Sequence, residues 1–208
     1  MERSNNNEAA KRELFRQIHE RYPRFFEAVI ADARLLLAFR QERFEFRSRL
    51  DGILQVLRLC WIADAFLALV LYRAQARLTA LSVPLLPKLF HHLAMSNGQV
   101  SIGEPVVVEP GVRFLHGMIV IDGVTEIHSG VQIAPFVTIG RRGAPINGPI
   151  VESNVLIGTG AKLIGPIRVG AGAQIGANAV VVDDVPPGVT VVGAPARPTA
   201  ASSEPVST

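Results

Sequence analysis

The sequence contains a single cysteine, Cys60, and few aromatic residues, which make up only 6% of the chain. One cysteine cannot form an internal disulfide, so the fold must depend on packing, and we expect a reducing, cytoplasmic compartment. Residues 1–11 are polar and charged, which does not resemble a secretory signal peptide. The formal net charge of +3 is too small to indicate a nucleic-acid-binding protein by itself.

Long hydrophobic runs and metal-ligand spacings are also missing. The most apolar stretch, residues 61–71, includes Asp64 and is far shorter than the roughly 20 residues that a membrane span requires. We interpret this stretch as a buried helix or as a contact between the helices of an oligomer. The five histidines follow no ligand spacing and no cysteine cluster accompanies them, so we expect no metal.

A period of six residues dominates the second half of the sequence. Ten aliphatic residues share this spacing in two runs, which are Ile121, Ile127, Ile133 and Ile139, then Val151, Ile157, Leu163, Val169, Ile175 and Val181. A helix repeats about every 3.6 residues and a strand alternates every second residue, so neither alone produces this period. Short strands joined by tight turns produce it when three hexads form each coil of a parallel β-helix.

Residues around the hexad starts indicate the same architecture. Small or aliphatic residues follow four positions after many of the starts; they are Val131, Val137, Val155, Ala161, Ile167, Ala173 and Ala179. Glycine or asparagine at the fourth position of many hexads suits a turn with positive φ. Earlier starts at Ile102, Val108 and Phe114 extend the frame, Val120 is one extra residue, and residues 140–149 interrupt the frame as a loop. The pattern predicts about four coils.

The first half of the sequence is predicted to be helical. Asn5 and Glu8 form a capping pattern that predicts a helix to about Arg21. Two further helices are expected over residues 24–50 and 52–81, with a break at the intervening glycine, and a short fourth one runs from the Pro84 region to about residue 95.

We therefore expect an α+β chain with three parts. Residues 1–98 form an α-helical oligomerisation region, residues 99–197 form the β-helix, and residues 198–208, which are rich in Ser, Ala, Thr and Pro, form a disordered tail.

Three stretches resemble serine acetyltransferases of the hexapeptide-repeat superfamily. Residues 184–197, with the sequence DVPPGVTVVGAPAR, are similar to the cap that closes the β-helix in this family. Residues 157–165 resemble its penultimate coil, and residues 114–140 resemble its active-site coil. The resemblance covers about residues 80–197 and implies a left-handed β-helix. It further implies a homotrimer or a dimer of trimers that binds acetyl-CoA between neighbouring subunits.

The same resemblance assigns roles to individual residues. His116 matches the family's general base, which removes the proton of an acceptor hydroxyl as that hydroxyl attacks acetyl-CoA directly. A neutral imidazole can accept a proton near neutral pH, so the residue type suits this role. Gly140, Thr159 and Ala177 match positions that hold the pantetheine arm. Arg141 could bind a CoA phosphate or an anionic acceptor, and a solvated loop explains it equally well.

Departures from the family concern the groups that recognise serine. Leu115 and Ser101 stand where the family has aspartates, and Asn147 and Gly148 stand where it has an Arg-His pair. His116 itself could also be a solvated corner residue.

Three functions therefore remain open at this point. The first is a serine O-acetyltransferase-like enzyme that serves cysteine biosynthesis. The second is an acetyltransferase for a sugar or a natural-product intermediate. The third is a catalytically inactive β-helix scaffold. If His116 is the base, Asp122, Glu126 and Glu152 are the carboxylates expected nearest to orient it, although a solvated turn residue is the favoured interpretation of each.

Overall fold

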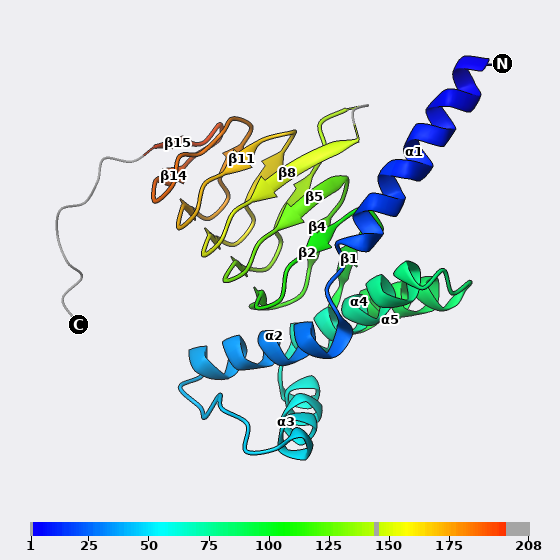
Figure 1. Ribbon diagram of the computed structural model, residues 1–208. Coiled ribbons are helices and arrows are strands. Elements are labelled where there is room, and N and C mark those ends of the chain that lie inside the picture. The colour runs from blue at the N-terminus through cyan, green and yellow to red at the C-terminus, as the bar shows by residue number, and fades with distance from the viewer. Residues whose placement is uncertain (1, 144–145, 199–208) are drawn as a thin grey trace.

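The computed structural model describes residues 2–143 and 146–198 as a group of helices followed by a parallel β-helix (Figure 1). The helices are α1 (Glu2–Glu20), α2 (Phe25–Phe39), α3 (Arg49–Ile62), α4 (Asp64–Ala80) and α5 (Leu86–Gly98). The predicted α+β fold class is confirmed. Residues 199–208, which hold nearly all of the predicted tail, lie outside the described residues. None of the described helices has the length and hydropathy needed to cross a membrane.

Two helix predictions are wrong at their boundaries. The helix expected over residues 24–50 ends at Phe39, and an irregular connection leads to Ser48, whose hydroxyl accepts a hydrogen bond from the Asp51 N–H at 3.1 Å. Gly52 lies inside α3 and does not break it. The helix expected over residues 52–81 is divided at Ala63, which is extended at φ −124° and ψ 107°. No proline or glycine marks this break, because it arises from packing.

The packing on either side of Ala63 explains the division. Leu59 of α3 belongs to a hydrophobic cluster with α2, whereas Leu69 and Tyr72 of α4 belong to the core of the β-helix. Phe66 of α4 also joins the α2 cluster, so the bend at Ala63 separates a helix that packs on α2 from one that packs on both α2 and the β-helix.

Three parallel sheets form the sides of the β-helix. Sheet A holds β1 (Val100–Ile102), β4 (Ile119–Ile121), β7 (Thr138–Gly140), β10 (Lys162–Ile164) and β13 (Val180–Val181). Sheet B holds β2 (Val107–Val108), β5 (Val124–Ile127), β8 (Asn147–Val151) and β11 (Arg168–Val169). Sheet C holds β3 (Arg113–Phe114), β6 (Gln132–Ile133), β9 (Leu156–Ile157), β12 (Gln174–Ile175), β14 (Thr190–Val192) and the antiparallel β15 (Arg197–Pro198).

The described strands make about five coils, so the predicted number of four is too low. The first coil begins at Val100 and the last ends at Val192, with an isolated bridge between Val169 and Val185 in place of a fifth strand in sheet B. The interrupting loop is also shorter than predicted, because Asn147 already pairs with Val124 as the start of β8.

The hexad frame itself is confirmed. All ten predicted starts are at most 2% exposed, and Ile121, Ile139 and Leu163 stand in register in sheet A. The fourth positions that carry glycine or asparagine have φ values between 57° and 79°; they are Gly111, Gly130, Asn154, Gly160, Gly172 and Asn178. Stacked aliphatic columns and left-handed corner residues therefore specify each coil.

Helix α4 covers the open end of the first coil, and its side chains form hydrogen bonds with the backbone of that coil. The Tyr72 hydroxyl donates to the Val106 carbonyl at 2.8 Å, and the Gln75 amide donates to the Ile102 carbonyl at 3.4 Å. The Arg73 guanidinium donates to the Val108 carbonyl and, at 2.7 Å, to the Glu109 carbonyl. These carbonyls belong to a sheet edge that no further coil pairs, so side chains take the place of the missing strand.

A buried ion pair fixes α2 to the same edge. Arg73 donates to Asp32 of α2 at 2.9 and 3.1 Å, and both side chains are at most 2% exposed. Asp32 also accepts hydrogen bonds from the Gly111 and Val112 N–H groups at 2.8 and 3.0 Å. One carboxylate thus joins two helices and a turn of the β-helix.

Replacement Asp32→Ala should lower the free energy of unfolding by about 3–5 kcal/mol, because it leaves the Arg73 charge buried and unpaired. Urea denaturation at a fixed protein concentration measures this loss. Glu42→Ala is the control, since Glu42 pairs with Arg58 at 2.6 Å on the exposed side of the α2–α3 connection and should change little. Equal effects of the two replacements would contradict the role given to Asp32.

Candidate active site

His116 lies at the corner where the first coil passes from sheet C to sheet A, between β3 and β4. Its side chain is exposed, whereas Phe114 two residues earlier is buried. The Leu115 N–H donates to the Ile133 carbonyl at 2.9 Å, and the Met118 N–H donates to the Gly98 carbonyl at 3.2 Å. Hydrogen bonds therefore fix the backbone on both sides of the histidine.

The end of α5 presses directly on this corner. A Cβ atom at Gly117 would lie 1.7 Å from the Gly98 carbonyl oxygen, so only glycine fits at this position. Gly98 is the last residue of α5, and Gln99 after it adopts a left-handed conformation at φ 52°. The helical half of the chain therefore positions the segment that carries His116.

Two more of the predicted site residues lie on the same corner in later coils. We call this corner, in successive coils, the C–A ridge; it consists of residues 115–118, 134–136, 158–160 and 176–178. Thr159 and Ala177 are exposed on it, and the Asn178 N–H donates to the Thr159 carbonyl at 2.8 Å. Coils are spaced by about 4.8 Å, so Thr159 stands about 10 Å along the ridge from His116.

The remaining two predicted residues lie on the other side of sheet A, where its strands end. Gly140 ends β7, is buried, and accepts a hydrogen bond from the Gly165 N–H at 2.9 Å. Arg141 is exposed, and its Nε lies 3.7 Å from Asp122 Oδ2. Within one chain, the structure thus brings His116, Thr159 and Ala177 onto one ridge but does not bring Gly140 or Arg141 to it.

The three carboxylates considered for orienting His116 have other partners. Asp122 lies at the far end of β4 beside Arg141. Glu126 accepts two hydrogen bonds from Arg21 of α1, both at 2.6 Å, and Glu152 pairs with Arg168 at 2.5 Å. Glu126 and Glu152 lie on sheet B, so neither they nor Asp122 share the corner of His116.

A charged network runs along sheet B from α1. His128 Nε2 lies 3.7 Å from Glu126 Oε2 and is partly exposed. The hydrogen bonds from Arg21 hold the pKa of Glu126 below its usual range, and partial burial opposes this effect only in part. We interpret the network as the attachment of α1 to the β-helix, because Arg21 is the residue that follows that helix.

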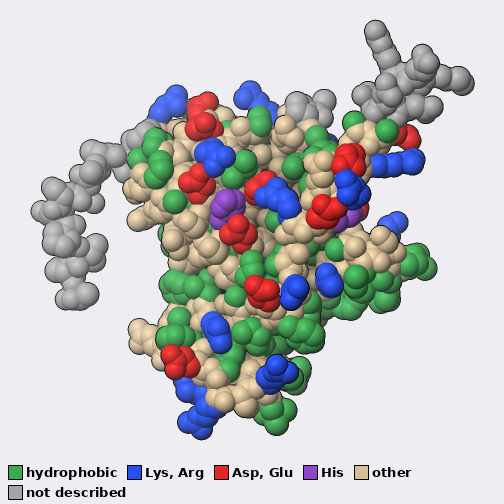
Figure 2. Space-filling view, in the orientation of Figure 1, with side chains coloured by type: hydrophobic (Ala, Val, Ile, Leu, Met, Phe, Trp, Pro, Cys, Tyr) green, Lys and Arg blue, Asp and Glu red, His purple; other side chains and the backbone are tan. Residues whose placement is uncertain are grey.

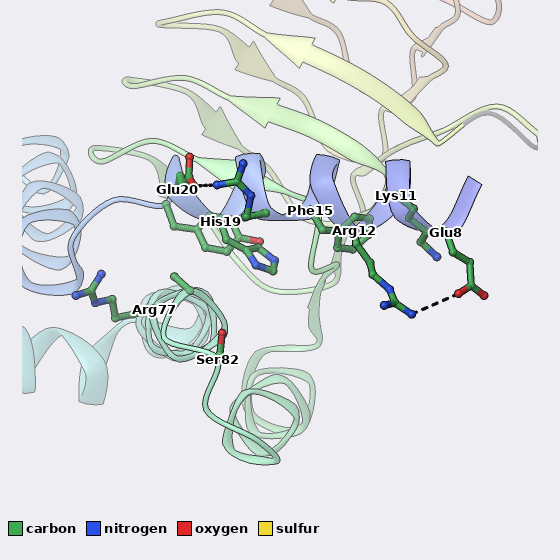
Figure 3. Close-up of a pocket in the computed structure, with 11 residues that line it drawn as sticks. Glu8, Lys11, Arg12, Phe15, His19, Glu20, Arg77 and Ser82 are labelled. Atoms are coloured by element: carbon green, nitrogen blue, oxygen red, sulfur yellow. Dashed lines mark hydrogen bonds and ion pairs between the residues drawn. The ribbon is translucent and has the colours of Figure 1, made fainter. Parts of the chain in front are cut away.

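Two cavities of the described residues lie away from His116. One of about 760 Å³ opens between α1 and the C-terminal end of α4, and Figure 3 shows Lys11, Arg12 and Arg77 beside Glu8 and Glu20 around it. Another of about 350 Å³ lies over sheet B and includes Asn147 and Gly148. The described residues contain no group of three metal-ligating side chains close enough to hold an ion.

Sequence reasoning missed two side chains beside His116. Met118 and Phe136 both have φ of 62° and are both exposed, at 41% and 55%. Phe136 occupies the fourth position of its hexad, where glycine or asparagine is expected. The hexad pattern therefore already marked this residue as an exception. Met118 occupies the equivalent place one coil earlier. Phe114 pairs with Ile133 and Val120 with Thr138, so the extra residue lies in the corner between the two strands and not at Val120 as predicted.

Comparison with known proteins identifies the relatives of this chain. Over 175 residues it is 35% identical to the serine acetyltransferase of Synechococcus elongatus, and the alignment covers 83% of this chain and 68% of that protein. Over 92 residues it is 48% identical to the serine acetyltransferase of Bacillus licheniformis, covering 42% of this chain and 43% of that protein. No family model matches the chain.

Solved structures agree with these relatives. The crystal structure of Neisseria gonorrhoeae serine acetyltransferase in complex with serine has a TM-score of 0.72 at 26% identity, and the match covers 85% of this chain and 69% of that chain. A serine acetyltransferase in complex with CoA has a TM-score of 0.69 at 27% identity, covering 90% of this chain and 75% of that chain.

The stacked hexapeptide coils beneath a helical cap, together with the relatives and solved structures that they match, define a β-helical acyltransferase of the hexapeptide-repeat class. Its reaction class is acetyl-CoA-dependent O-acetyl transfer. The alignment with the Synechococcus enzyme covers more than two thirds of both chains, and the chain belongs to the serine acetyltransferase family.

The attachment of α1 should depend on pH through Glu126. Because Arg21 lowers the pKa of Glu126 in the folded state, the pair stabilises the fold above the carboxyl's unfolded pKa. This contribution, on the order of 0.5 kcal/mol for such a partly exposed pair, is lost as the pH falls through the lowered folded pKa.

The free energy of unfolding is therefore measured between pH 3 and 7 for the native chain and for Glu126→Gln. The two values should differ at neutral pH only. Arg21→Gln should remove the same pH-dependent part, and combining the two replacements should add nothing further. Additive effects would mean that the two residues act independently.

Proposed function

We propose that His116 is the general base of an O-acetyl transfer from acetyl-CoA to the hydroxyl of a small acceptor. The observation that carries this proposal is the placement of an exposed imidazole on a corner whose backbone is fixed by α5 and by the second coil. Thr159 and Ala177 on the same ridge support it, because they extend the surface along which the pantetheine arm of CoA would lie.

The reaction would proceed by direct attack. His116 takes the proton of the acceptor hydroxyl while the oxygen forms a bond to the thioester carbonyl carbon of acetyl-CoA. The tetrahedral intermediate then collapses with cleavage of the carbon–sulfur bond, and the imidazolium returns the proton to the CoA thiolate. The products are the O-acetylated acceptor and free CoA, and His116 ends in its starting form.

A homo-oligomer would complete the site. Gly140 and Arg141 lie across sheet A from His116 in one chain, so a neighbouring subunit would supply them to the CoA groove. We propose a homotrimer or a dimer of trimers, in which Arg141 exchanges its contact with Asp122 for a CoA phosphate. On this view residues 1–98 serve assembly and residues 99–197 carry the chemistry.

The identity of the acceptor follows less directly from the family than the identity of the acetyl donor does. The Neisseria enzyme was solved with serine, which supports a small hydroxyl compound and a role in cysteine biosynthesis in the cytoplasm. Leu115, Ser101, Asn147 and Gly148 carry no charge, however, and these are the positions of the family's serine-recognising groups. They favour a second candidate, which is acetylation of a sugar or of a natural-product intermediate.

Replacement His116→Ala should lower turnover by about 10²–10⁴ without altering the fold, because it removes only the proton acceptor. CoA release from acetyl-CoA is measured with L-serine, homoserine, simple sugars and amino sugars. His128→Ala is the matched control, since His128 lies on sheet B and pairs with Glu126. Turnover equal to that of the native chain in His116→Ala would remove the residue from the mechanism.

The exposed face of α3 supports the assembly. Its apolar side chains recur at helical spacing, with Trp61 90% exposed; they are Leu50, Ile53, Leu54, Leu57 and Trp61. Figure 2 shows hydrophobic side chains gathered over the lower, helical part of this face, with charged side chains scattered among them. A surface stripe of this kind indicates a protein contact.

Replacement Leu57→Glu should therefore reduce the molar mass in solution, because it places a charge in the proposed contact between trimers. Light scattering after size-exclusion chromatography measures the mass. Gln55→Glu is the control on the same helix, outside the apolar stripe, and should leave the mass unchanged. A native mass for Leu57→Glu would show that α3 takes no part in assembly.

A further inference from the structure

The ridge that carries His116 also presents two exposed apolar side chains on an unusual backbone conformation. Met118 and Phe136 occupy equivalent places on the C–A ridge, one coil apart, and both have φ of 62°. The same place in the next two coils is taken by Gly160 and Asn178, at φ 74° and 57°. Glycine and asparagine tolerate this left-handed region, whereas bulky side chains are rare in it.

Contacts from neighbouring elements hold these two residues where they are. The Met118 N–H donates to the Gly98 carbonyl at 3.2 Å. Lys162 Nζ donates to the Phe136 carbonyl at 2.6 Å, and the Gly160 N–H donates to the Pro135 carbonyl at 2.9 Å. Strained residues that the surrounding structure enforces in this way are concentrated at functional sites.

Both side chains point away from the core. Phe136 is 55% exposed, Met118 41% and Val120, on the adjoining outer face of sheet A, 44%. They cannot be explained by core packing, because the buried columns of the same coils are formed by Ile119, Val137 and their neighbours.

Charged groups are scarce on this face. The residues that point outward in the middle of sheet A are Ser101, Val120, Thr138, Lys162 and Val180. Lys162 alone among these five is charged, and its ammonium already binds the Phe136 carbonyl. A free amino acid needs a partner for its ammonium group, and no carboxylate is among these five residues.

We propose that the acceptor is an uncharged alcohol with an aliphatic or aromatic group, which packs on Met118, Val120 and Phe136 while its hydroxyl faces His116. This inference rests on the proposed function, since it assumes that His116 is the base. Met118 and Phe136 are specificity-determining residues in this account, and the strained corners are retained because glycine or asparagine there would remove the apolar contact.

The test compares acceptors in the full-length protein with acetyl-CoA as donor. We expect kcat/KM for 1-hexanol and 2-phenylethanol to exceed that for L-serine by roughly tenfold to hundredfold, the range that small apolar contacts provide. Met118→Gly and Phe136→Asn should each lower kcat/KM for these alcohols by about tenfold while raising the thermal midpoint, because both new residues suit a positive φ. Phe26→Asn, at an exposed phenylalanine of α2, is the control and should leave kcat/KM unchanged.

Different outcomes overturn different parts of the argument. His116-dependent turnover of L-serine that exceeds turnover of the apolar alcohols would overturn this inference and leave the proposed function standing. A loss of oligomer mass in Met118→Gly or Phe136→Asn would assign these side chains to a subunit contact and would also overturn it. If no acceptor in either panel gave His116-dependent release, the proposed function would fail and this inference with it.

Discussion

The open edge of the first coil is the constraint on which the rest of the structure depends. A β-helix satisfies its backbone groups by stacking each coil on the next, so its first coil presents carbonyls with no partner. Tyr72, Arg73 and Gln75 of α4 donate to those carbonyls, and Asp32 of α2 binds Arg73 and accepts from two further backbone N–H groups. The helical half is therefore the cap of the β-helix, and one hydrophobic cluster runs through both.

This cap also determines the geometry of the candidate active site. Because α4 fixes the base of the first coil, α5 is brought against the corner that carries His116, and Gly117 is in contact with the end of that helix. The left-handed conformation of Met118 follows from the same contact. A base placed one coil further along would be flanked by other coils only. The proximity of His116 to the helical cap thus links the stability of the fold to the position of the proposed base.

Sheet A separates two sets of the residues assigned to the candidate site. The C–A ridge, where the strands of this sheet begin, carries His116, Thr159 and Ala177. Gly140 and Arg141 lie at the other end of the strands. Residues on opposite sides of the sheet can act in one site only if the two sides meet between different subunits. The proposed activity therefore depends on the proposed assembly. The outer face between the edges is partly apolar and has Lys162 as the one charged residue among its five central positions, and this character bears on the acceptor rather than on CoA.

The sequence alone determined the stacked coils, because an aliphatic residue at every sixth position admits few architectures and because glycine and asparagine recur where φ is positive. It did not determine the break at Ala63 or the end of α2 at Phe39, since both follow from which faces are buried against the first coil. It also placed Gly140 and His116 in one site, although they lie on opposite edges of a sheet in one chain. Only the tertiary structure could show that Phe136 keeps a left-handed backbone on the outer surface beside His116, because a repeat pattern specifies inward positions and leaves outward ones free.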